Sequence, residues 1–296
     1  MGLDNTGVRL HCWLKSQGHS FKQVATLGRQ TFYGVTKDSL NRAARKFGLA
    51  LSDDDAQRIL TGSDGFADGL YRWLGAETVD SFDYSDYEGA TKLWDMNGSV
   101  PREFQENYDF VFDGGTLEHV FNYPKALREA LTLPRVGGMF LSGTPANSYL
   151  GHGFYQLGPD LPFSVLSEGN GYRLEDALLV EMRHNSRFFE ILPPNKRAGR
   201  ALASTTWPTQ MFFSGVRTGS VPENLTAFQP DYESAWENGQ HQERTAGGAM
   251  ETIRRSIGWL PQEFRNDLLR TAKLIYVGLS RNSLFDRTSF RRRDDI

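Results

Sequence analysis

A buried strand that ends in an acid and two glycines constrains the fold of this chain more than any other segment. Residues 108–113 read Tyr-Asp-Phe-Val-Phe-Asp, and Gly114 and Gly115 break the pattern. A short apolar run bounded by glycine is typical of a strand buried inside a parallel sheet. Residues 124–133 then carry apolar side chains on one face of a predicted helix. We therefore expect a strand–helix unit at the centre of the fold.

Similar strands alternate with helices along the chain. The other predicted strands span 23–27, 78–83, 91–94, 139–142, 177–182 and 210–216. Helical spacing and capping residues predict three helices between 36 and 75, which form an insertion after the first strand. This alternation predicts an α/β fold, a doubly wound (Rossmann-like) sheet of about seven strands.

The composition of the chain changes after residue 218. A polar, proline-containing stretch leads to a predicted amphipathic helix, whose apolar stripe runs from Phe264 to Leu279. We expect residues 1–218 to form the main domain and 219–296 to form a C-terminal extension packed on it. The alternative for the stripe is a homodimer contact. Arg291 to Arg293, followed by two acids, predict a frayed and solvated end.

Charge and cysteine content exclude several classes of protein. The 296 residues carry a formal net charge of −3, which argues against a nucleic-acid binder with a broad basic surface. Cys12 is the only cysteine, so no intramolecular disulfide can form. No window is apolar enough to span a membrane. We expect a cytoplasmic protein.

Acidic residues follow three of the predicted strands. Ligands of a doubly wound sheet bind beyond the carboxyl ends of its strands, where Asp83, Asp95 and Asp113 are expected. The two oxygens of Asp83 suit a pair of vicinal ribose hydroxyls, and Asp95 could accept from an adenine amino group. The alternative is that these acids cap helices or begin turns.

Residues 110–120, Phe-Val-Phe-Asp-Gly-Gly-Thr-Leu-Glu-His-Val, resemble the fourth strand and following loop of class I S-adenosylmethionine-dependent methyltransferases. Residues 126–131 and 136–145 are similar to the helix and fifth strand that follow. The resemblance covers about residues 20 to 218. It implies S-adenosylmethionine as the cofactor and methyl transfer to an oxygen or nitrogen of a small-molecule or glycan-type acceptor.

The loop after the first strand departs from the family. The usual Gly-x-Gly-x-Gly is replaced here by Gly28-Arg29-Gln30, and Asp83 comes much later in the chain than the usual spacing of about 20 residues. The alternative therefore stays open that the protein is a catalytically inactive, methyltransferase-like binding or scaffold protein.

The resemblance implies a cofactor site at the first four strand ends, where Arg29 could pair with the cofactor carboxylate. Its implied residues are Gly28, Arg29, Gln30, Asp83, Tyr84, Asp95, Met96, Asn97, Asp113, Gly114 and Thr116.

The loop after the fifth strand, residues 147–156, corresponds to the family's acceptor pocket. Its His152 and Tyr155 are candidates to orient the acceptor or take its proton, and His119 is a second candidate base. All three could instead have structural roles. His119, His152, His184 and His241 lack the sequence spacing of a zinc site, so no metal is expected.

Overall fold

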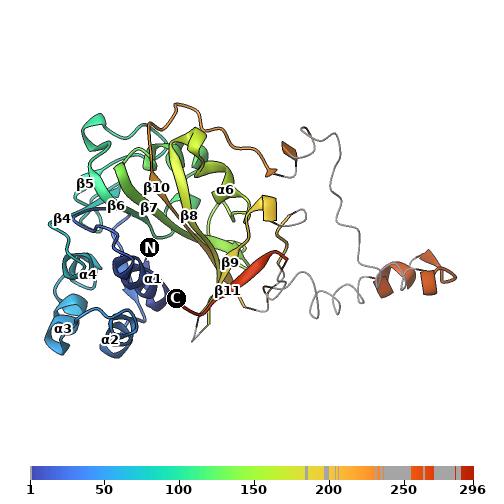
Figure 1. Cartoon of the computed structure of the whole chain (residues 1–296), viewed down its shortest axis with the longest axis horizontal. Helices are drawn as coiled ribbons and strands as arrows, with labels where there is room; N and C mark the ends of the chain where they lie inside the picture. Colours follow the sequence, from blue (N-terminus) through green and yellow to red (C-terminus); the bar gives the residue numbers. More distant parts are fainter. Residues whose placement is uncertain are drawn as a thin grey trace.

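A nine-stranded mixed sheet forms the centre of the molecule (Figure 1). The structure is a computed structural model that describes residues 2–183, 186–196, 200–203, 205, 207–230, 232, 233, 236, 255–262, 264–269, 284 and 288–296. The described residues form the strands β1 (Gly2–Asp4), β2 (Gln23–Leu27), β3 (Thr31–Tyr33), β4 (Thr78–Asp83), β5 (Lys92–Leu93), β6 (Tyr108–Asp113), β7 (Pro134–Asn147), β8 (Tyr172–Glu181), β9 (Arg187–Ile191), β10 (Thr209–Arg217) and β11 (Phe290–Arg293), of which β1 and β3 form a separate two-stranded sheet. Its α-helices are α1 (Asn5–Ser16), α2 (Lys37–Lys46), α3 (Asp53–Thr61), α4 (Asp68–Trp73), α5 (Tyr123–Ala130) and α6 (Leu161–Val165). Four 3₁₀ turns are η1 (Arg102–Phe104), η2 (Leu117–His119), η3 (Glu168–Asn170) and η4 (Pro194–Lys196).

The parallel half of the sheet confirms the α/β prediction. Strands β5, β4, β2, β6 and β7 lie side by side in that order, all parallel. The chain leaves β2 toward β4 and β5, then crosses back to place β6 on the other side of β2. The order therefore reverses between β2 and β6, and a sheet of this kind binds its ligands outside that point.

The other half of the sheet is antiparallel. Strand β10 lies between β7 and β8, and β9 and β11 extend the edge. The described sheet therefore has nine strands, so the prediction of about seven was too low. The two extra strands, β9 and β11, lie next to each other at one edge.

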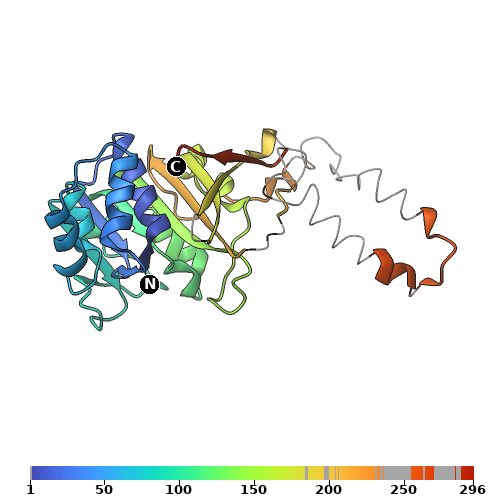
Figure 2. The same ribbon diagram turned by 90° about the horizontal axis from the view of Figure 1, so that it is seen from below.

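The prediction of a frayed C-terminal end was wrong. Residues 290–293 form β11, which pairs with β9 along the edge of the sheet (Figure 2). Arg291 pairs with Glu190, and Arg293 lies 3.4 Å from Asp176 of β8. Ile296 is fully buried. The sequence shows only the local pairs, Arg292 with Asp294 and Arg293 with Asp295, whereas the partners on neighbouring strands, Glu190 and Asp176, are distant in sequence.

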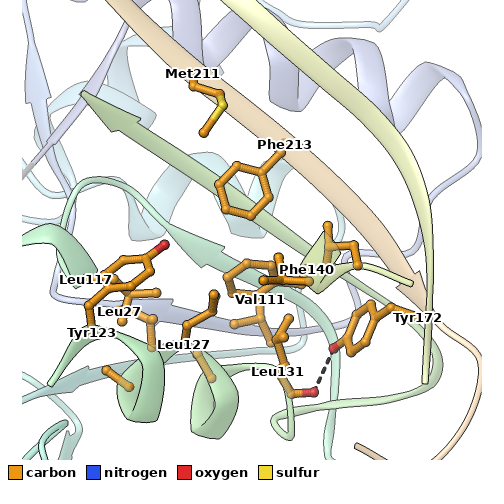
Figure 3. Close-up of a cluster of buried hydrophobic side chains, with 14 of the residues drawn as sticks. Leu27, Val111, Leu117, Tyr123, Leu127, Leu131, Phe140, Tyr172, Met211 and Phe213 are labelled. Atoms are coloured by element: carbon orange, nitrogen blue, oxygen red, sulfur yellow. Dashed lines mark hydrogen bonds between the residues drawn. The ribbon is translucent and has the colours of Figure 1, made fainter. Parts of the chain in front are cut away.

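Helices cover both faces of the sheet. Helices α1 to α4 lie on one face, and α5, α6 and the η2 turn lie on the other (Figure 1). The second face is packed by Val111 and Phe140 of the sheet against Leu127 and Leu131, while Tyr172 donates its hydroxyl to the Leu131 carbonyl at 2.7 Å (Figure 3). Each layer therefore has an apolar core of its own.

The three helices of the insertion after β2, α2 to α4, lie within the predicted range of residues 36–75. Thr36 caps α2 and accepts a hydrogen bond from Ser39 N–H, and Gly48 follows α2 with a φ of +69°. Ser52 caps α3 in the same way, accepting from Asp55 N–H. These local capping bonds satisfy backbone groups that the helix itself leaves unpaired, so they can be recognised from sequence.

A strand–helix segment at the N-terminal side was not predicted. Strand β1 pairs in parallel with β3, which directly follows the loop after β2, and α1 begins right after β1. Asp4 caps α1 by accepting a hydrogen bond from Gly7 N–H at 2.9 Å. Residues 2–7 are thereby placed beside the carboxyl end of the sheet.

The predicted C-terminal helix is only partly described. Phe264 and Leu268 are 65% and 47% exposed in the described part of the apolar stripe. Its remaining members, Ala272, Ile275, Tyr276 and Leu279, lie outside the described residues, so its packing stays a prediction. Among the described residues, no helix has the length and apolar character needed to cross a membrane.

Candidate active site

Asp113 ends β6 at the switch point, but its carboxylate is engaged by neighbouring protein groups. One oxygen accepts from Thr116 N–H at 2.9 Å and Leu117 N–H at 3.3 Å, and the other accepts from the Ser142 hydroxyl at 2.8 Å. Burial raises the pKa of Asp113, although these hydrogen bonds oppose the shift. The arrangement matches the alternative that this acid begins a turn, because it fixes η2 onto β7.

Thr116 also holds the strand ends together. Its hydroxyl donates to the Leu27 carbonyl at the end of β2 at 2.5 Å. Leu27 lies opposite Asp113 in the parallel register, so the ends of β2 and β6 are joined at the switch point.

In the loop after β2, the polar side chains form hydrogen bonds with other groups of the protein. Gly28 has a φ of +69°, and Gln30 is buried with its amide nitrogen donating to the Leu27 and Gly28 carbonyls at 2.8 and 3.1 Å. Arg29 donates to Asp68 and to the Glu88 carbonyl, and it lies over the Phe66 ring. The expected pairing of Arg29 with a cofactor carboxylate would have to compete with these contacts.

The ends of β4 and β5 keep polar groups at the surface of the sheet edge. Asp83 is half-buried, and one of its oxygens accepts from Tyr84 N–H at 2.7 Å. Asp95 is exposed and accepts from both nitrogens of Asn97, while Met96 is buried. In Asp83 and in Asp95 alike, the second carboxylate oxygen has no hydrogen bond within the described part of the chain.

A cavity of about 310 Å³ opens beside the switch point. Part of its wall is formed by Gly114 and Gly115, which directly follow β6, and by Gly143 within β7. The segment around β1 contributes Gly2, Leu3, Asp4 and Gly7, and Tyr33, Gln210 and Phe212 complete the apolar and polar lining. Of the predicted site residues, Gly114, His119 and His152 line this cavity, whereas Gly28, Asp83 and Asp95 do not.

Glu118 is the most unusual side chain of the cavity. It is fully buried, and neither of its carboxylate oxygens has a hydrogen-bond partner among the described residues. Burial, followed by the nearby Asp113 carboxyl, raises the pKa of Glu118. A buried carboxylate without partners costs several kcal/mol unless it is neutralised or bound (about 2–7 kcal/mol for a neutral polar group alone).

Two histidines face Glu118. His152 Nε2 lies 3.6 Å from Glu118 Oε1, and the His119 and His152 rings are 5.2 Å apart. Burial lowers the pKa of His119, and the neighbouring His152 adds to this effect. The structure therefore brings together two of the three predicted catalytic residues, with a glutamate that the prediction did not assign.

Tyr155 does not line the cavity. Its hydroxyl donates to the Phe121 carbonyl at 2.7 Å, and its ring packs against Tyr123. The backbone N–H groups of Phe154 and Tyr155 both donate to the Glu118 carbonyl. Tyr155 therefore fixes the loop that carries His152, which is the structural alternative for this residue.

Glu118 belongs to the Leu-Glu-His-Val segment, and the sequence predicted no role for it. The spacing of the histidines could not reveal the cluster, because His119 and His152 are 33 positions apart, with α5 and β7 between them. The available signal was the adjacent Glu118-His119 pair directly after a buried strand end.

Comparisons with known proteins found similar structures but no similar sequence among protein families or curated proteins. No protein-family model matches the chain, and no curated protein matches it. The chain is similar to the branched-chain polyamine synthase of Thermus thermophilus, at 13% identity over 75% of this chain and 59% of that chain, with a TM-score of 0.36. It is similar to the trans-methyltransferase CalH in complex with SAH, at 11% identity over 71% of this chain and 55% of that chain, with a TM-score of 0.35.

A third similar structure is the 16S rRNA (adenine(1408)-N(1))-methyltransferase of Catenulisporales acidiphilia, at 11% identity, 71% and 91% coverage, and a TM-score of 0.36. The chain spans less than three fifths of the first two proteins. At these identities and TM-scores, the comparisons do not identify what this chain binds.

Proposed function

We propose that the protein transfers a methyl group from S-adenosylmethionine to an oxygen or nitrogen of a small-molecule or glycan-type acceptor. The observation that carries the proposal is the position of the cavity beside the switch point. The two segments that resemble class I methyltransferases include the fourth and fifth parallel strands in chain order, β6 and β7. The cavity is lined by Gly114 and Gly115, which follow β6, and by Gly143 of β7.

The remaining strand ends fit the same proposal. Asp83 follows the second parallel strand with one carboxylate oxygen available to ribose hydroxyls. Gly28 has positive φ and no side chain, so the backbone there can pass close to a ligand. S-adenosylmethionine has no pyrophosphate, so a loop with one glycine need not supply the anion-binding amides of a dinucleotide site.

Methyl transfer depends mainly on the alignment of the acceptor atom with the methyl donor. The acceptor atom must lie in line with the sulfonium methyl, and holding the two together supplies much of the rate enhancement. In such a transfer the acceptor atom would bond to the methyl carbon as the carbon–sulfur bond breaks, and S-adenosylhomocysteine would leave. A base would take the acceptor's proton, and His119 and His152 are the candidates. The Glu118, His119 and His152 cluster lies on the cavity wall, where it would contact the acceptor's reacting end.

The alternative, a binding or scaffold protein without catalysis, has one observation in its favour. Arg29 and Gln30 direct their side chains into internal contacts, which departs from an open cofactor loop. Against it stands the cavity-lining cluster, because a scaffold has no use for a buried carboxylate without partners beside two histidines.

Calorimetry with S-adenosylmethionine and S-adenosylhomocysteine tests the cofactor before any acceptor is known. We expect both to bind, and Asp83→Ala to weaken binding by about 1.5–3 kcal/mol because a charge-assisted hydrogen bond is lost. Asp86→Ala, an exposed acid in the following loop, is the matched control and should bind like the unaltered chain. Absence of binding at millimolar ligand would reject the proposal.

Turnover separates the enzyme from the scaffold. Metabolite extracts supplied with a labelled methyl donor should yield a labelled product. His152→Ala should lower that turnover by roughly 10²–10⁴-fold while cofactor affinity stays nearly unchanged, because the side chain acts on the acceptor. Label transfer that is equal in the variant and the unaltered chain would contradict the assignment of the cavity.

A further inference from the structure

We propose that Glu118, His119 and His152 form a binding site for a divalent transition-metal ion on the wall of the cavity. One carboxylate oxygen and one ring nitrogen from each histidine lie within 4.8 Å of one another. Donors bonded to one ion at about 2.1 Å lie roughly 3–4 Å apart, and Glu118 Oε1 and His152 Nε2 are separated by 3.6 Å. Small side-chain rotations would bring all three donors to bonding distance.

The state of Glu118 is an independent observation that points to a ligand. Both of its oxygens are buried and accept no hydrogen bond from the described residues, since the nearest histidine nitrogen, His152 Nε2, lies 3.6 Å away, and Glu118 lines the cavity. Buried carboxylates are ordinarily paired with a cation or coordinate a metal. A bound ion would supply the missing partner and offset the free-energy cost of burying the charge.

The backbone holds the donors in place. The Glu118 carbonyl accepts from Phe154 N–H at 2.9 Å and Tyr155 N–H at 3.3 Å, which ties η2 to the loop carrying His152. A Cβ at Gly153 would lie 3.0 Å from both Glu118 Cγ and the Glu118 carbonyl oxygen, closer than nearly all real Cβ contacts. Glycine at this position therefore allows the loop to approach Glu118.

The donor set selects the class of metal. Two imidazole nitrogens and one carboxylate suit zinc, iron(II) or cobalt(II), whereas magnesium and calcium prefer sites made of oxygen alone. Three protein donors leave coordination positions open toward the cavity, as in catalytic sites that also bind water or a substrate oxygen. The inference goes beyond the proposed methyl transfer, because metal binding here needs neither the methyl donor nor the acceptor.

Titration of the full, chelator-treated chain with zinc chloride, followed by calorimetry, tests the proposal. We expect the cluster to bind one zinc ion per chain. The affinity for zinc should fall roughly 100-fold in His152→Ala and in the isosteric Glu118→Gln. His19→Ala is the matched control, since His19 does not line the cavity, and it should bind zinc like the unaltered chain. Saturating zinc should raise the melting temperature of the unaltered chain and of His19→Ala, but not that of His152→Ala or Glu118→Gln.

Two results would overturn the metal site. One is a failure of the unaltered chain to bind zinc stoichiometrically, and the other is equal affinity in both cluster variants. If a variant fails to fold, the X-ray absorption spectrum of the zinc-loaded, unaltered chain decides instead: a shell with two imidazoles supports the site, and a shell of oxygens alone overturns it. Neither measurement includes S-adenosylmethionine, so its outcome is separate from that of the proposed function.

Discussion

Protonation of His11 should limit the stability of this protein in mild acid. His11 lies on α1 and is completely buried against the sheet, with its ring edge-on to Phe110 and Phe112. Nδ1 lies 2.8 Å from the Gly7 carbonyl, and Nε2 lies 3.3 Å from the Tyr71 hydroxyl. The neutral ring satisfies both contacts by donating to the first and accepting from the second.

Burial lowers the pKa of His11 from 6.5 to about 4, although the hydrogen bond to Gly7 opposes the shift. The unfolded chain therefore binds this proton more tightly than the folded chain. The free energy of unfolding should fall as the pH drops through the window from 6.5 to 4, and His11 adds no further loss below that window. The total effect is about 3 kcal/mol, of which about 2 kcal/mol should appear by pH 5.

Urea unfolding at pH 7.5 and pH 5.0 measures this effect when the unaltered chain is compared with His11→Gln. The variant lacks the titrating group, so its loss of stability over this interval should be smaller by about 2 kcal/mol. All other titrating groups are shared and cancel in the difference. Equal losses in the two chains, or an NMR titration that gives His11 a pKa near 6.5, would refute the reasoning.

Three further changes test the packing of the sheet ends. Asp113→Ala removes the acceptor of three hydrogen bonds and should lower the free energy of unfolding in urea by about 3 kcal/mol or more, so a change below 1 kcal/mol would contradict its structural role. Gly171→Ala should cost about 2–4 kcal/mol because φ is +75° and a Cβ would overlap the Ser220 carbonyl, whereas Gly169→Ala, with no atom within 4 Å of its Cβ, is the control that should be nearly neutral. Deletion of residues 288–296 should lower the melting temperature and cause aggregation visible by light scattering, and a monomeric truncated chain of unchanged stability would show that β11 is dispensable.

The sequence predicted the parallel half of the fold well because its signals are local. All six residues of β6 are buried, and its apolar centre, Phe110 to Phe112, is followed by Asp113 and two glycines, which is a pattern that the sequence shows directly. The caps of α2 and α3 are contacts between residues three positions apart, Thr36 with Ser39 and Ser52 with Asp55. Such features depend on neighbours in the sequence and can be recognised without a structure.

The edge strands and the cavity cluster could not be predicted because their partners are distant in sequence. The charge of Arg293 suggests solvent until Asp176, more than a hundred residues earlier, is seen beside it. Glu118 resembles any surface acid in the sequence, and its burial becomes evident only when the loop with His152 folds over it. Asp113 was predicted correctly at a strand end, but the hydrogen bond that it accepts from the Ser142 hydroxyl depends on the register of β6 with β7.

The pairing of β11 with β9 has a consequence for how the protein is made. Strand β9 ends at Ile191 and β11 begins at Phe290, so about a hundred residues must leave the ribosome between the two. At roughly 5–20 residues per second, this interval lasts about 5–20 seconds. During that time the nascent chain carries a complete β9 whose outer backbone groups have not yet met β11. A holding chaperone would therefore be of most use to this protein in the interval between the synthesis of β9 and that of β11.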